Sequence, residues 1–459
     1  MKPAAPVLAE YAANLRYDDI PEAVLARSRQ CIADTLGACV LGSSLPWGRM
    51  VEAHARRHGA GGTSRIAGSG TNVHAPAAAL ANGVFAHGFE LDSLRQPGAG
   101  VHPGASLVPA LLAVGESVGA SGRDVLVAFV AGCEVLFRIG AATHHSSEAR
   151  GFHAPGLTGP FGAAIAAGRL LKLDAAQLGN ALGIAGSFCA GLLAFNHAQQ
   201  GSMVKRLHLG RAAEAGVVAA SLASEGYEGP DTVLEGRHGF LETFCERPEA
   251  GLLTRGLGAG FETLRICLKR YACHITAHTP VQSVSEMREE GGFDGRDVAT
   301  ITVRAGPKVL AQHANRDPRD VMEAQYSVPF CAAIALYDDP LDPLAFSERS
   351  LKDAGIREAA RRLALEPLPE ATRLSSWSSE VIVRLTDGRE FARTADTFKG
   401  TPATPMSMEE LRAKFMRCTA GFGDAERLFE QALALERVSD VRELAIADRA
   451  PLTNVSTDT

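Results

Sequence analysis

Histidines, lysines and carboxylates interrupt otherwise apolar, small-residue stretches of the chain in five clusters. Histidine can accept or donate a proton near neutral pH. Lysine and arginine can bind a carboxylate, and Asp or Glu can act as a general acid or base. This combination predicts acid–base chemistry on a small anionic substrate. The five clusters are 87–92 with 102–104, 150–156, 203–210, 268–278 and 324–330.

The first two clusters contain candidate proton-transfer groups. Glu90 and Asp92 follow a long apolar helix pattern, and a glycine-rich loop then leads to His102. Carboxylates gain nothing from the helix dipole at this end of a helix. A role in catalysis or in orienting histidines therefore competes evenly with a solvated helix end. His153 lies in a turn before a helix, where its ring could instead satisfy loop carbonyls.

The third and fourth clusters contain cations beside histidines. Lys205 and Arg206 precede an alanine-rich helix and suit a carboxylate substrate, although a surface loop would also contain them. Lys269 precedes His274, which has the i, i+4 spacing of metal-binding histidines with His278. No Glu follows His274 and no third ligand candidate lies nearby in the sequence. An acid–base or substrate-binding role is therefore favoured over zinc.

The fifth cluster places Ser327 at a helix start, where its hydroxyl and the backbone N–H groups could bind an anion. Taken alone, the segment is better explained as an ordinary capped helix start. The glycine-rich stretches 256–260 and 61–64 lack the dinucleotide and P-loop patterns. We expect neither a metal nor an organic cofactor.

The first half of the chain must position most of these residues, and its pattern is helical. Apolar or small residues recur at helical spacing after Ile20, with Asp19 suited to cap that helix and Pro21 to its first turn. Small residues on many helix faces predict a compact helical bundle without a βαβ rhythm. Further helices are predicted over 77–89, 106–118, 124–142, 158–171, 174–193 and 210–225.

The pattern changes after about Leu264. Residues 298–304 alternate like a half-buried strand, and 380–385 and 390–393 flank an Asp-Gly turn as in a hairpin. Helical pattern returns over 407–418, where Ser407 and Glu410 have capping-box spacing, and over 424–448. We therefore expect a mainly α protein with a smaller α+β domain inserted into a large all-helical domain.

The expected domain boundaries follow from this change of pattern. Residues 1–264 and 405–453 are expected to form the all-helical domain, and residues 265–404 the inserted α+β domain. The polar end, 454–459, is expected to be a frayed tail.

Composition narrows the class of protein. The 459 residues are 46% hydrophobic and 21% charged, which is typical of a globular protein. The net charge of −6 and the absence of a Lys/Arg-rich run predict no nucleic-acid partner. The nine cysteines form no C-x-x-C pair, and neither a signal-peptide pattern nor an uninterrupted membrane-length apolar run is present. We expect a cytoplasmic protein that does not bind membranes.

Taken together, the clusters resemble the MmgE/PrpD family, in order and over nearly the whole chain. That family includes 2-methylcitrate dehydratase, cis-aconitate decarboxylase and iminodisuccinate epimerase. The resemblance implies a large helical domain with an inserted α+β domain, a homodimer, and an active site between the domains that needs no organic cofactor. The matching strings are 33–37, 79–83, 101–104, 151–153, 205–213, 269–271, His274 and 396–400.

By position, the resemblance also implies active-site residues. These are Glu90, Asp92, His102, His153, Lys205, Lys269 and His274. The sequence departs from the family pattern at three points. The usual Asp-x-Asp-Asp motif reads Glu90-Leu91-Asp92-Ser93, and a tyrosine common after the serine-containing helix start is Phe330. The loop leading to His102 is also slightly longer than in the decarboxylase branch.

These residue types suit the formation or protonation of a carbanion beside a carboxylate. We expect His102, His153 and His274 to share proton transfer, with Glu90 and Asp92 orienting a histidine or the substrate hydroxyl. Substrate carboxylates are expected to bind at Lys205, Lys269, Arg206 and Ser327.

Several reactions remain compatible with this chemistry. The leading prediction is a hydro-lyase resembling 2-methylcitrate dehydratase, which abstracts a proton alpha to a carboxylate of a small polycarboxylate. An epimerase or racemase of an iminodisuccinate-like dicarboxylate is the second, and a cis-aconitate-type decarboxylase the third. Outside enzymes, the chain could be a non-catalytic homologue that only binds polycarboxylates.

Overall fold

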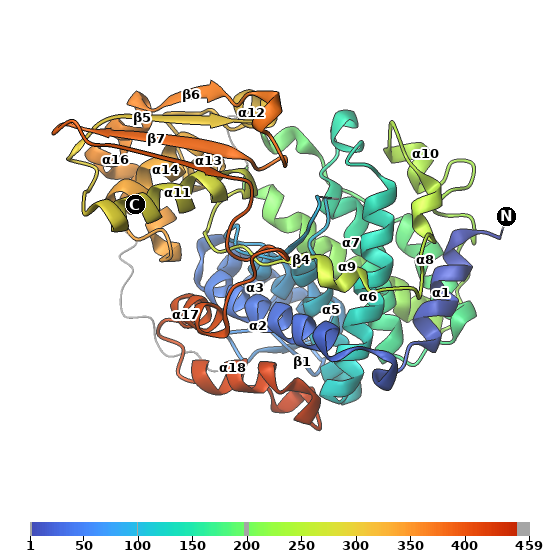
Figure 1. Cartoon of the computed structure of the whole chain (residues 1–459). Helices are drawn as coiled ribbons and strands as arrows, with labels where there is room; N and C mark the ends of the chain where they lie inside the picture. Colours follow the sequence, from blue (N-terminus) through green and yellow to red (C-terminus); the bar gives the residue numbers. More distant parts are fainter. Residues whose placement is uncertain (1, 99, 197–201, 448–459) are drawn as a thin grey trace. The chain divides into compact units, whose positions relative to one another are not determined.

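The computed structural model describes residues 2–98, 100–196 and 202–447, coloured along the chain in Figure 1. The protein is mainly helical, and it divides into two compact units. Unit 1 comprises the described residues of 1–88, 92–267 and 411–459, and unit 2 comprises Phe89–Leu91 and Leu268–Glu410. The predicted tail over 454–459 lies outside the described residues.

Unit 1 is built from helices and two short antiparallel strand pairs. Helices α4, α5, α7 and α9 pack against one another at its centre, and α6 and α8 pack against α7. The helices are α1 (Ala4–Asn14), α2 (Glu22–Ser44), α3 (Pro46–His58), α4 (Ala75–Ala86), α5 (Pro103–Val118), α6 (Gly122–Ala142), α7 (Ala154–Leu170), α8 (Ala175–Gly186), α9 (Val204–Ser224), α10 (Phe240–Phe244), most of α17 (Met408–Cys418) and α18 (Ala425–Leu433). Strand β1 (Ser64–Arg65) pairs with β2 (Asn72–Val73), and β3 (Leu94–Arg95) with β4 (Ile266–Cys267).

Small residues bring the central helices close together, as the sequence predicts. A Cβ added to Gly210 of α9 would lie 2.5 Å from the Leu80 carbonyl oxygen of α4. One added to Gly216 would lie 2.3 Å from the Ala163 Cβ of α7. Both distances are shorter than a side chain tolerates, so glycine sets the spacing of α9 against its neighbours. This spacing holds the start of α9, which contains Lys205 and His208, against the rest of unit 1.

Three details of the helix predictions are wrong. Asp19 does not cap α2, because its carboxylate accepts the Arg16 N–H at 3.2 Å within a short 3-10 turn. Pro21 is itself the N-cap residue of α2 rather than part of its first turn. The helix predicted over 174–193 ends at Gly186, and the later φ of +127° at Gly191 is incompatible with helix.

The helix predicted over 424–448 is also too long. Helix α18 ends at Leu433, and two 3-10 turns follow, Leu435–Arg437 and Val441–Glu443. The Asp440 side chain accepts the Arg442 N–H, which starts the second turn separately. A local capping interaction therefore replaces continuation of the helix. Residue 448 lies outside the described residues.

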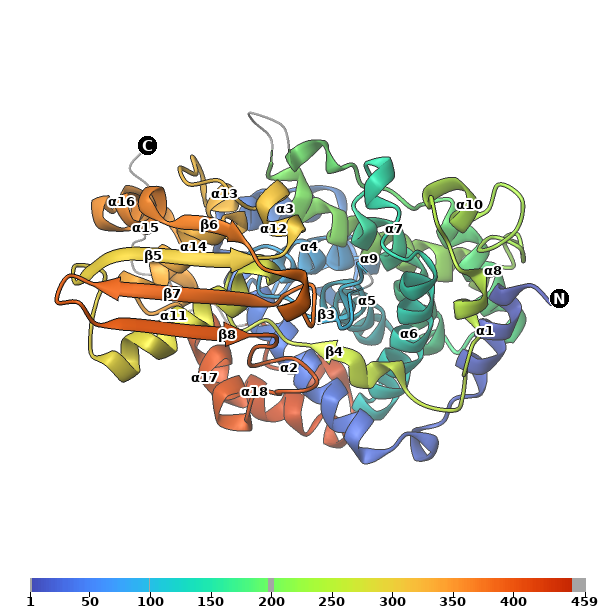
Figure 2. The same ribbon diagram turned by 45° about the horizontal axis from the view of Figure 1, so that its top comes forward.

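Unit 2 contains a four-stranded mixed sheet of order β6-β5-β7-β8, and Figure 2 shows the four strands side by side. Its strands are β5 (Val298–Ala305), β6 (Ala364–Pro367), β7 (Ser379–Leu385) and β8 (Glu390–Ala395). Strands β5 and β6 are parallel and the other pairs antiparallel. The predicted strand and hairpin are confirmed, with Gly388 in the turn at a φ of +91°.

Helices complete unit 2, and α11 packs on β7 and β8. The capping box predicted at the start of α17 is confirmed, because Glu410 N–H donates to Ser407 Oγ and Ser407 N–H donates to the Glu410 carboxylate. The helices are α11 (His278–Gly291), α12 (Pro307–Gln312), α13 (Val321–Tyr326), α14 (Val328–Tyr337), α15 (Glu348–Lys352) and α16 (Ala354–Arg362).

Among the described residues, α6 alone has the length and mean hydropathy of a membrane-spanning helix. Within unit 1, 94% of its apolar window is buried. Helix α6 therefore has the burial of a core helix.

Candidate active site

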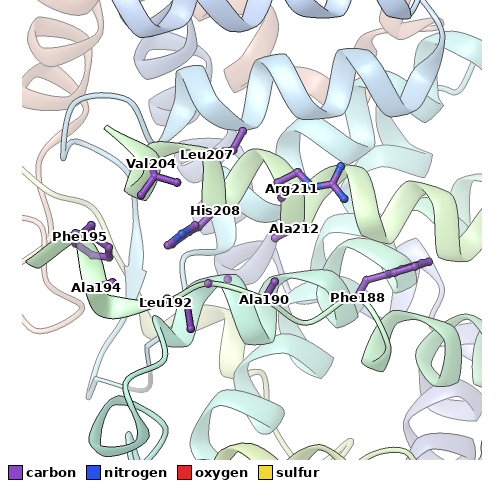
Figure 3. Close-up of a pocket in the computed structure, with 12 residues that line it drawn as sticks. Phe188, Ala190, Leu192, Ala194, Phe195, Val204, Leu207, His208, Arg211 and Ala212 are labelled. Atoms are coloured by element: carbon purple, nitrogen blue, oxygen red, sulfur yellow. The ribbon is translucent and has the colours of Figure 1, made fainter. Parts of the chain in front are cut away.

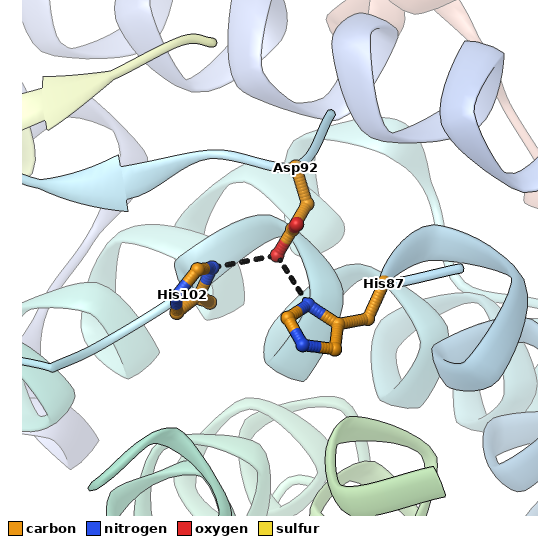
Figure 4. A group of neighbouring side chains, drawn as sticks. All are labelled: His87, Asp92 and His102. Atoms are coloured by element: carbon orange, nitrogen blue, oxygen red, sulfur yellow. Dashed lines mark hydrogen bonds and ion pairs between the residues drawn. The ribbon is translucent and has the colours of Figure 1, made fainter. Parts of the chain in front are cut away.

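Asp92 joins two histidine rings in unit 1. Its Oδ2 atom lies 3.0 Å from Nδ1 of His87 and 2.7 Å from Nδ1 of His102, as Figure 4 shows. His87 is the C-cap residue of α4, Asp92 precedes β3, and His102 is the N-cap residue of α5. Three helix and strand ends therefore place one carboxylate between two imidazoles.

Charge fixes the direction of these hydrogen bonds. Burial alone would raise the pKa of the Asp92 carboxyl, but the His87 and His102 rings outweigh it and hold that pKa well below its usual range. An ionised carboxylate only accepts hydrogen bonds, so both rings donate their Nδ1–H to it. In a neutral ring of this tautomer, Nε2 has a free lone pair. His102 is therefore arranged as a base, in the way that an aspartate orients a catalytic histidine.

The buried partner, His87, is held neutral. Burial lowers the pKa of the His87 ring to about 3, against the opposing effect of Asp92. The charge of Lys205 lowers this pKa further. His87 therefore contributes a fixed N–H to Asp92, whereas the His102 side chain is 16% exposed and accessible for reaction.

His87, Asp92 and His102 also have the residue types of a metal site, since one ligand atom from each lies within 4.8 Å of the others. Ligand atoms about 2.1 Å from a tetrahedral ion would lie ~3.4 Å apart. The observed 2.7 Å and 3.0 Å separations are hydrogen-bond lengths. The geometry fits a hydrogen-bonded triad, and the requirement for no metal stays a prediction.

A second histidine pair lies beside this triad. Nδ1 of His153, the N-cap residue of α7, is 3.0 Å from Nδ1 of His208 on α9. The His153 ring also lies 6.1 Å from the His87 ring, centroid to centroid. Only one proton fits between two Nδ1 atoms, so one ring donates and the other accepts. One ring of the neutral pair therefore has a free Nε2 lone pair, and the other an Nε2–H.

Both rings of this pair are shifted toward the neutral form. Burial lowers the pKa of His153 well below its usual range, with the His87 and His208 rings adding to the effect. Burial, helped by the charge of Lys205, lowers the pKa of His208 to about 4. The neutral pair can therefore relay a proton, because the Nε2–H of one ring donates while the Nε2 of the other ring accepts a replacement. His208 is a site residue that the sequence pattern did not predict, although its i, i+3 spacing from Lys205 on one helix is a signal for it.

The first turn of α9 contains both cations of the third cluster. Lys205 is 2% exposed, and its charge acts on both His87 and His208. Lys205 is therefore placed to attract an anion to the histidines. Arg206 donates from Nε to the Gly88 carbonyl at 2.9 Å, and its guanidinium lies 3.8 Å from the centroid of the Trp47 ring. These contacts fix the segment before Glu90, and a substrate contact of Arg206 stays a prediction.

Unit 2 contains the buried pair of Glu90 and Lys269. Lys269 Nζ donates to Glu90 Oε2 at 2.9 Å, and their side chains are 2% and 6% exposed. Gln325 holds the same segment by donating to the carbonyls of Phe89 and Ala272. Glu90 has a φ of +56°, in the left-handed region that costs a non-glycine residue energy. Such strain is often retained at functional positions, which supports the predicted role of Glu90.

His274 has a different environment in unit 2. Its Nδ1 accepts the Thr276 N–H at 3.4 Å and lies 2.8 Å from Thr276 Oγ1. The neutral ring therefore has its proton on Nε2, the opposite tautomer from His102. His313 stacks on the ring at 4.2 Å, with Tyr326 at 4.8 Å, and neither was predicted as a site residue. Both become neighbours of His274 only through tertiary folding.

The remaining candidates of unit 2 have structural contacts. Ser327 is the N-cap residue of α14, where it accepts the Phe330 N–H at 3.0 Å and donates to the Asn315 carbonyl. His278 begins α11 and packs on the rings of Tyr271 and Phe398. The capped-helix interpretation accounts for Ser327, and its contact with a substrate carboxylate stays a prediction.

Comparison with known proteins adds a family match. The MmgE/PrpD N-terminal domain matches residues 7–253, and the MmgE/PrpD C-terminal domain matches residues 271–437. A cis-aconitate decarboxylase of Homo sapiens is 30% identical over 421 residues, covering 88% of this chain and 85% of that protein. A cis-aconitate decarboxylase of Aspergillus terreus (strain NIH 2624 / FGSC A1156) is 29% identical over 465 residues, covering 95% and 94%.

Proposed function

The chain belongs to the MmgE/PrpD family, and we propose that it is a lyase acting on a small polycarboxylate. The observation that carries the proposal is the pair of separately held histidines in unit 1. Asp92 orients His102, and His208 holds His153. A base and an acid are therefore available close to a buried lysine.

The proposed reaction begins at a C–H beside a carboxylate. The free Nε2 of His102 accepts that proton, and the charge of Lys205 stabilises the enediolate-like carbanion that forms. In dehydration, the C–O bond to the neighbouring hydroxyl then breaks as the alkene forms. The Nε2–H of one ring of the His153–His208 pair protonates the leaving hydroxide to water, the shared proton moves between the two Nδ1 atoms, and the Nε2 of the other ring takes up a proton from solvent. His102 then releases its proton to solvent, so that both groups return to their starting state.

Dehydration of a citrate-type acid, as 2-methylcitrate dehydratase performs, is our leading proposal for the reaction. It needs both a base and an acid, and the two held histidines supply both. We retain Glu90, Lys269, His274, Arg206 and Ser327 as proposed contributors to catalysis or substrate binding. A homodimeric, cytoplasmic protein without a metal or organic cofactor is part of the same proposal.

Decarboxylation is the second candidate, because the relatives reported above are cis-aconitate decarboxylases. That reaction loses carbon dioxide and then needs one proton at the carbanion, so it would use only one of the two histidine groups. The departures from the family pattern at Glu90, Ser93 and Phe330 do not select between dehydration and decarboxylation. Epimerisation of an iminodisuccinate-like acid, or binding without catalysis, remains the alternative if neither lyase reaction occurs.

A substrate screen tests the proposal. The purified protein is incubated with citrate, 2-methylcitrate, cis-aconitate and iminodisuccinate, and ultraviolet absorbance and released carbon dioxide are recorded. We expect absorbance of a conjugated alkene from a citrate-type acid without carbon dioxide. Release of carbon dioxide from cis-aconitate would show that the protein is a decarboxylase and not a dehydratase. If no acid is converted, the lyase proposal is wrong.

A further inference from the structure

A pocket opens beside the His153–His208 pair in unit 1. It has a volume of about 370 Å³ and lies between the start of α9 and the segment 188–195 that follows α8. Figure 3 shows His208 pointing from α9 toward this segment. His208 is therefore a wall of the pocket as well as the hydrogen-bonding partner of His153.

The other walls are mostly apolar. Ala190, Ala194, Phe195, Val204 and Leu207 line the space with hydrocarbon. Among the described lining residues, Arg211 alone has a permanent charge, and its guanidinium pairs with Glu214 one turn further along α9. A substrate carboxylate would gain little in such surroundings, whereas a hydrocarbon group would leave water for apolar contacts.

One aromatic ring, Phe195, lines the pocket and also contacts both rings of the histidine pair. The Phe195 ring packs edge-on against His153 with centroids 5.6 Å apart, and it lies 5.9 Å from His208. A group attached to a substrate at His153 would therefore meet Phe195 first and the alanine-lined space beyond it.

Several large apolar side chains that line this pocket are exposed to solvent. The lining residues Phe188, Leu192 and Val204 are 39%, 59% and 45% exposed. Large apolar side chains that surround an apolar pocket mark a binding surface for an apolar group. The volume is also far larger than a methyl group requires.

We propose that this pocket is a subsite for an uncharged alkyl substituent of the acid substrate. The inference rests on the function proposed above and narrows its substrate class to polycarboxylates with an alkyl chain of several carbons. The carboxylates would remain near Lys205, and the chain would extend past Phe195 along α9.

A chain-length series tests the inference. Turnover of citrate and of its 2-methyl, 2-butyl and 2-hexyl derivatives is measured as kcat/KM. Each buried methylene should raise kcat/KM by about fourfold until the pocket is filled. Values that stay level or fall with chain length would overturn the subsite while leaving the lyase proposal intact.

A pocket-narrowing variant separates the subsite from general apolar binding. Ala194→Phe should lower the ratio of kcat/KM for the hexyl over the methyl acid at least tenfold, because the ring fills the space. Ala53→Leu changes an alanine of α3 that is also exposed but lies outside the pocket, and it should leave this ratio unchanged. Equal ratios in the two variants would place the chain elsewhere and overturn the inference.

Binding of inert analogues distinguishes failure of the subsite from failure of the proposed function. Alkyl-substituted tricarballylates lack the leaving hydroxyl, so calorimetry can measure their binding without reaction. We expect tighter binding and a more negative heat-capacity change with each added methylene. Chain-length-dependent binding without turnover of any acid would retain the subsite and contradict the lyase. Absence of both would overturn the two together.

Discussion

Asp92 determines the protonation state of two rings through one oxygen atom. Because Oδ2 accepts from His87 and His102, the carboxylate selects the Nδ1–H tautomer of both. The neutral His87 is a fixed donor, so Asp92 can stabilise positive charge when it develops on His102. Asp92 therefore orients the His102 ring and does not itself transfer a proton.

Replacing Asp92 tests this role at the residue scale. Asp92→Asn keeps the size of the side chain but removes its charge, and its amide can donate to a ring nitrogen. We expect kcat to fall by about 10²- to 10⁴-fold, because the base tautomer of His102 is lost. Steady-state kinetics measure the change, and circular dichroism checks that the variant is folded. Activity within a factor of three of the wild type would contradict the orienting role.

Residue types alone predicted much of the candidate site. His102, His153, Asp92 and Lys205 were identified because polar groups are rare within small-residue helical stretches. The partners of those residues were not predictable in the same way. The His153–His208 contact joins residues 55 positions apart, and His274 meets His313 and Tyr326 only after folding. Periodicity contains no information about such pairs.

At the scale of elements, α9 depends on close contact with α4. Gly210 allows this contact, since a Cβ there would lie 2.5 Å from the Leu80 carbonyl oxygen. The contact positions the first turn of α9, from which Lys205 and His208 extend. Helix periodicity predicts α4 to α7, and strand alternation around the Asp-Gly turn predicts the β7–β8 hairpin. Periodicity fails where α8 and α18 end, because local turns and caps decide those ends.

A pair of glycine substitutions tests the helix contact. Gly210→Ala should destabilise the protein by about 1–3 kcal/mol, because the added methyl group overpacks the α4–α9 contact. It should also lower kcat by displacing Lys205 and His208. Gly179→Ala in α8 is the matched control, since its nearest neighbour would be the Ala9 Cβ at 3.9 Å. That control should be neutral or stabilise by up to about 1 kcal/mol.

Denaturant unfolding with enzyme assays measures both effects. Equal stability of the two alanine variants would contradict the proposed glycine contact. Reduced stability of Gly210→Ala with unchanged kcat would show that the contact supports the fold but not the position of the catalytic groups.

At the scale of the whole molecule, buried neutral histidines make stability depend on pH. The pKa of His87 is about 3 in the folded protein, against an ordinary value near 6.5 in the unfolded chain. As pH falls below 6.5, the unfolded chain binds a proton there that the folded protein does not. The free energy of unfolding must therefore fall as pH decreases from about 6.5 toward 3.

The variant His87→Gln isolates this effect. Removing one such histidine should flatten the pH dependence near pH 5 by up to about 1.4 kcal/mol per pH unit. Denaturant unfolding at pH 6 and pH 4.5 gives the slope for variant and wild type. Identical slopes would mean that His87 takes up its proton equally in both states.

If the protein transfers a proton at a carbon beside a carboxylate, deuterium from heavy water must enter the acid at that carbon. The wild-type protein and His102→Gln are incubated with the alkene acid that the substrate screen identifies as the dehydration product, because its hydration must place a solvent proton on that carbon. The hydrated acid is followed by nuclear magnetic resonance. We expect the wild type to incorporate deuterium at that carbon, and His102→Gln to incorporate it about 100-fold more slowly. Equal incorporation by both proteins, or none by the wild type, would contradict this proton transfer.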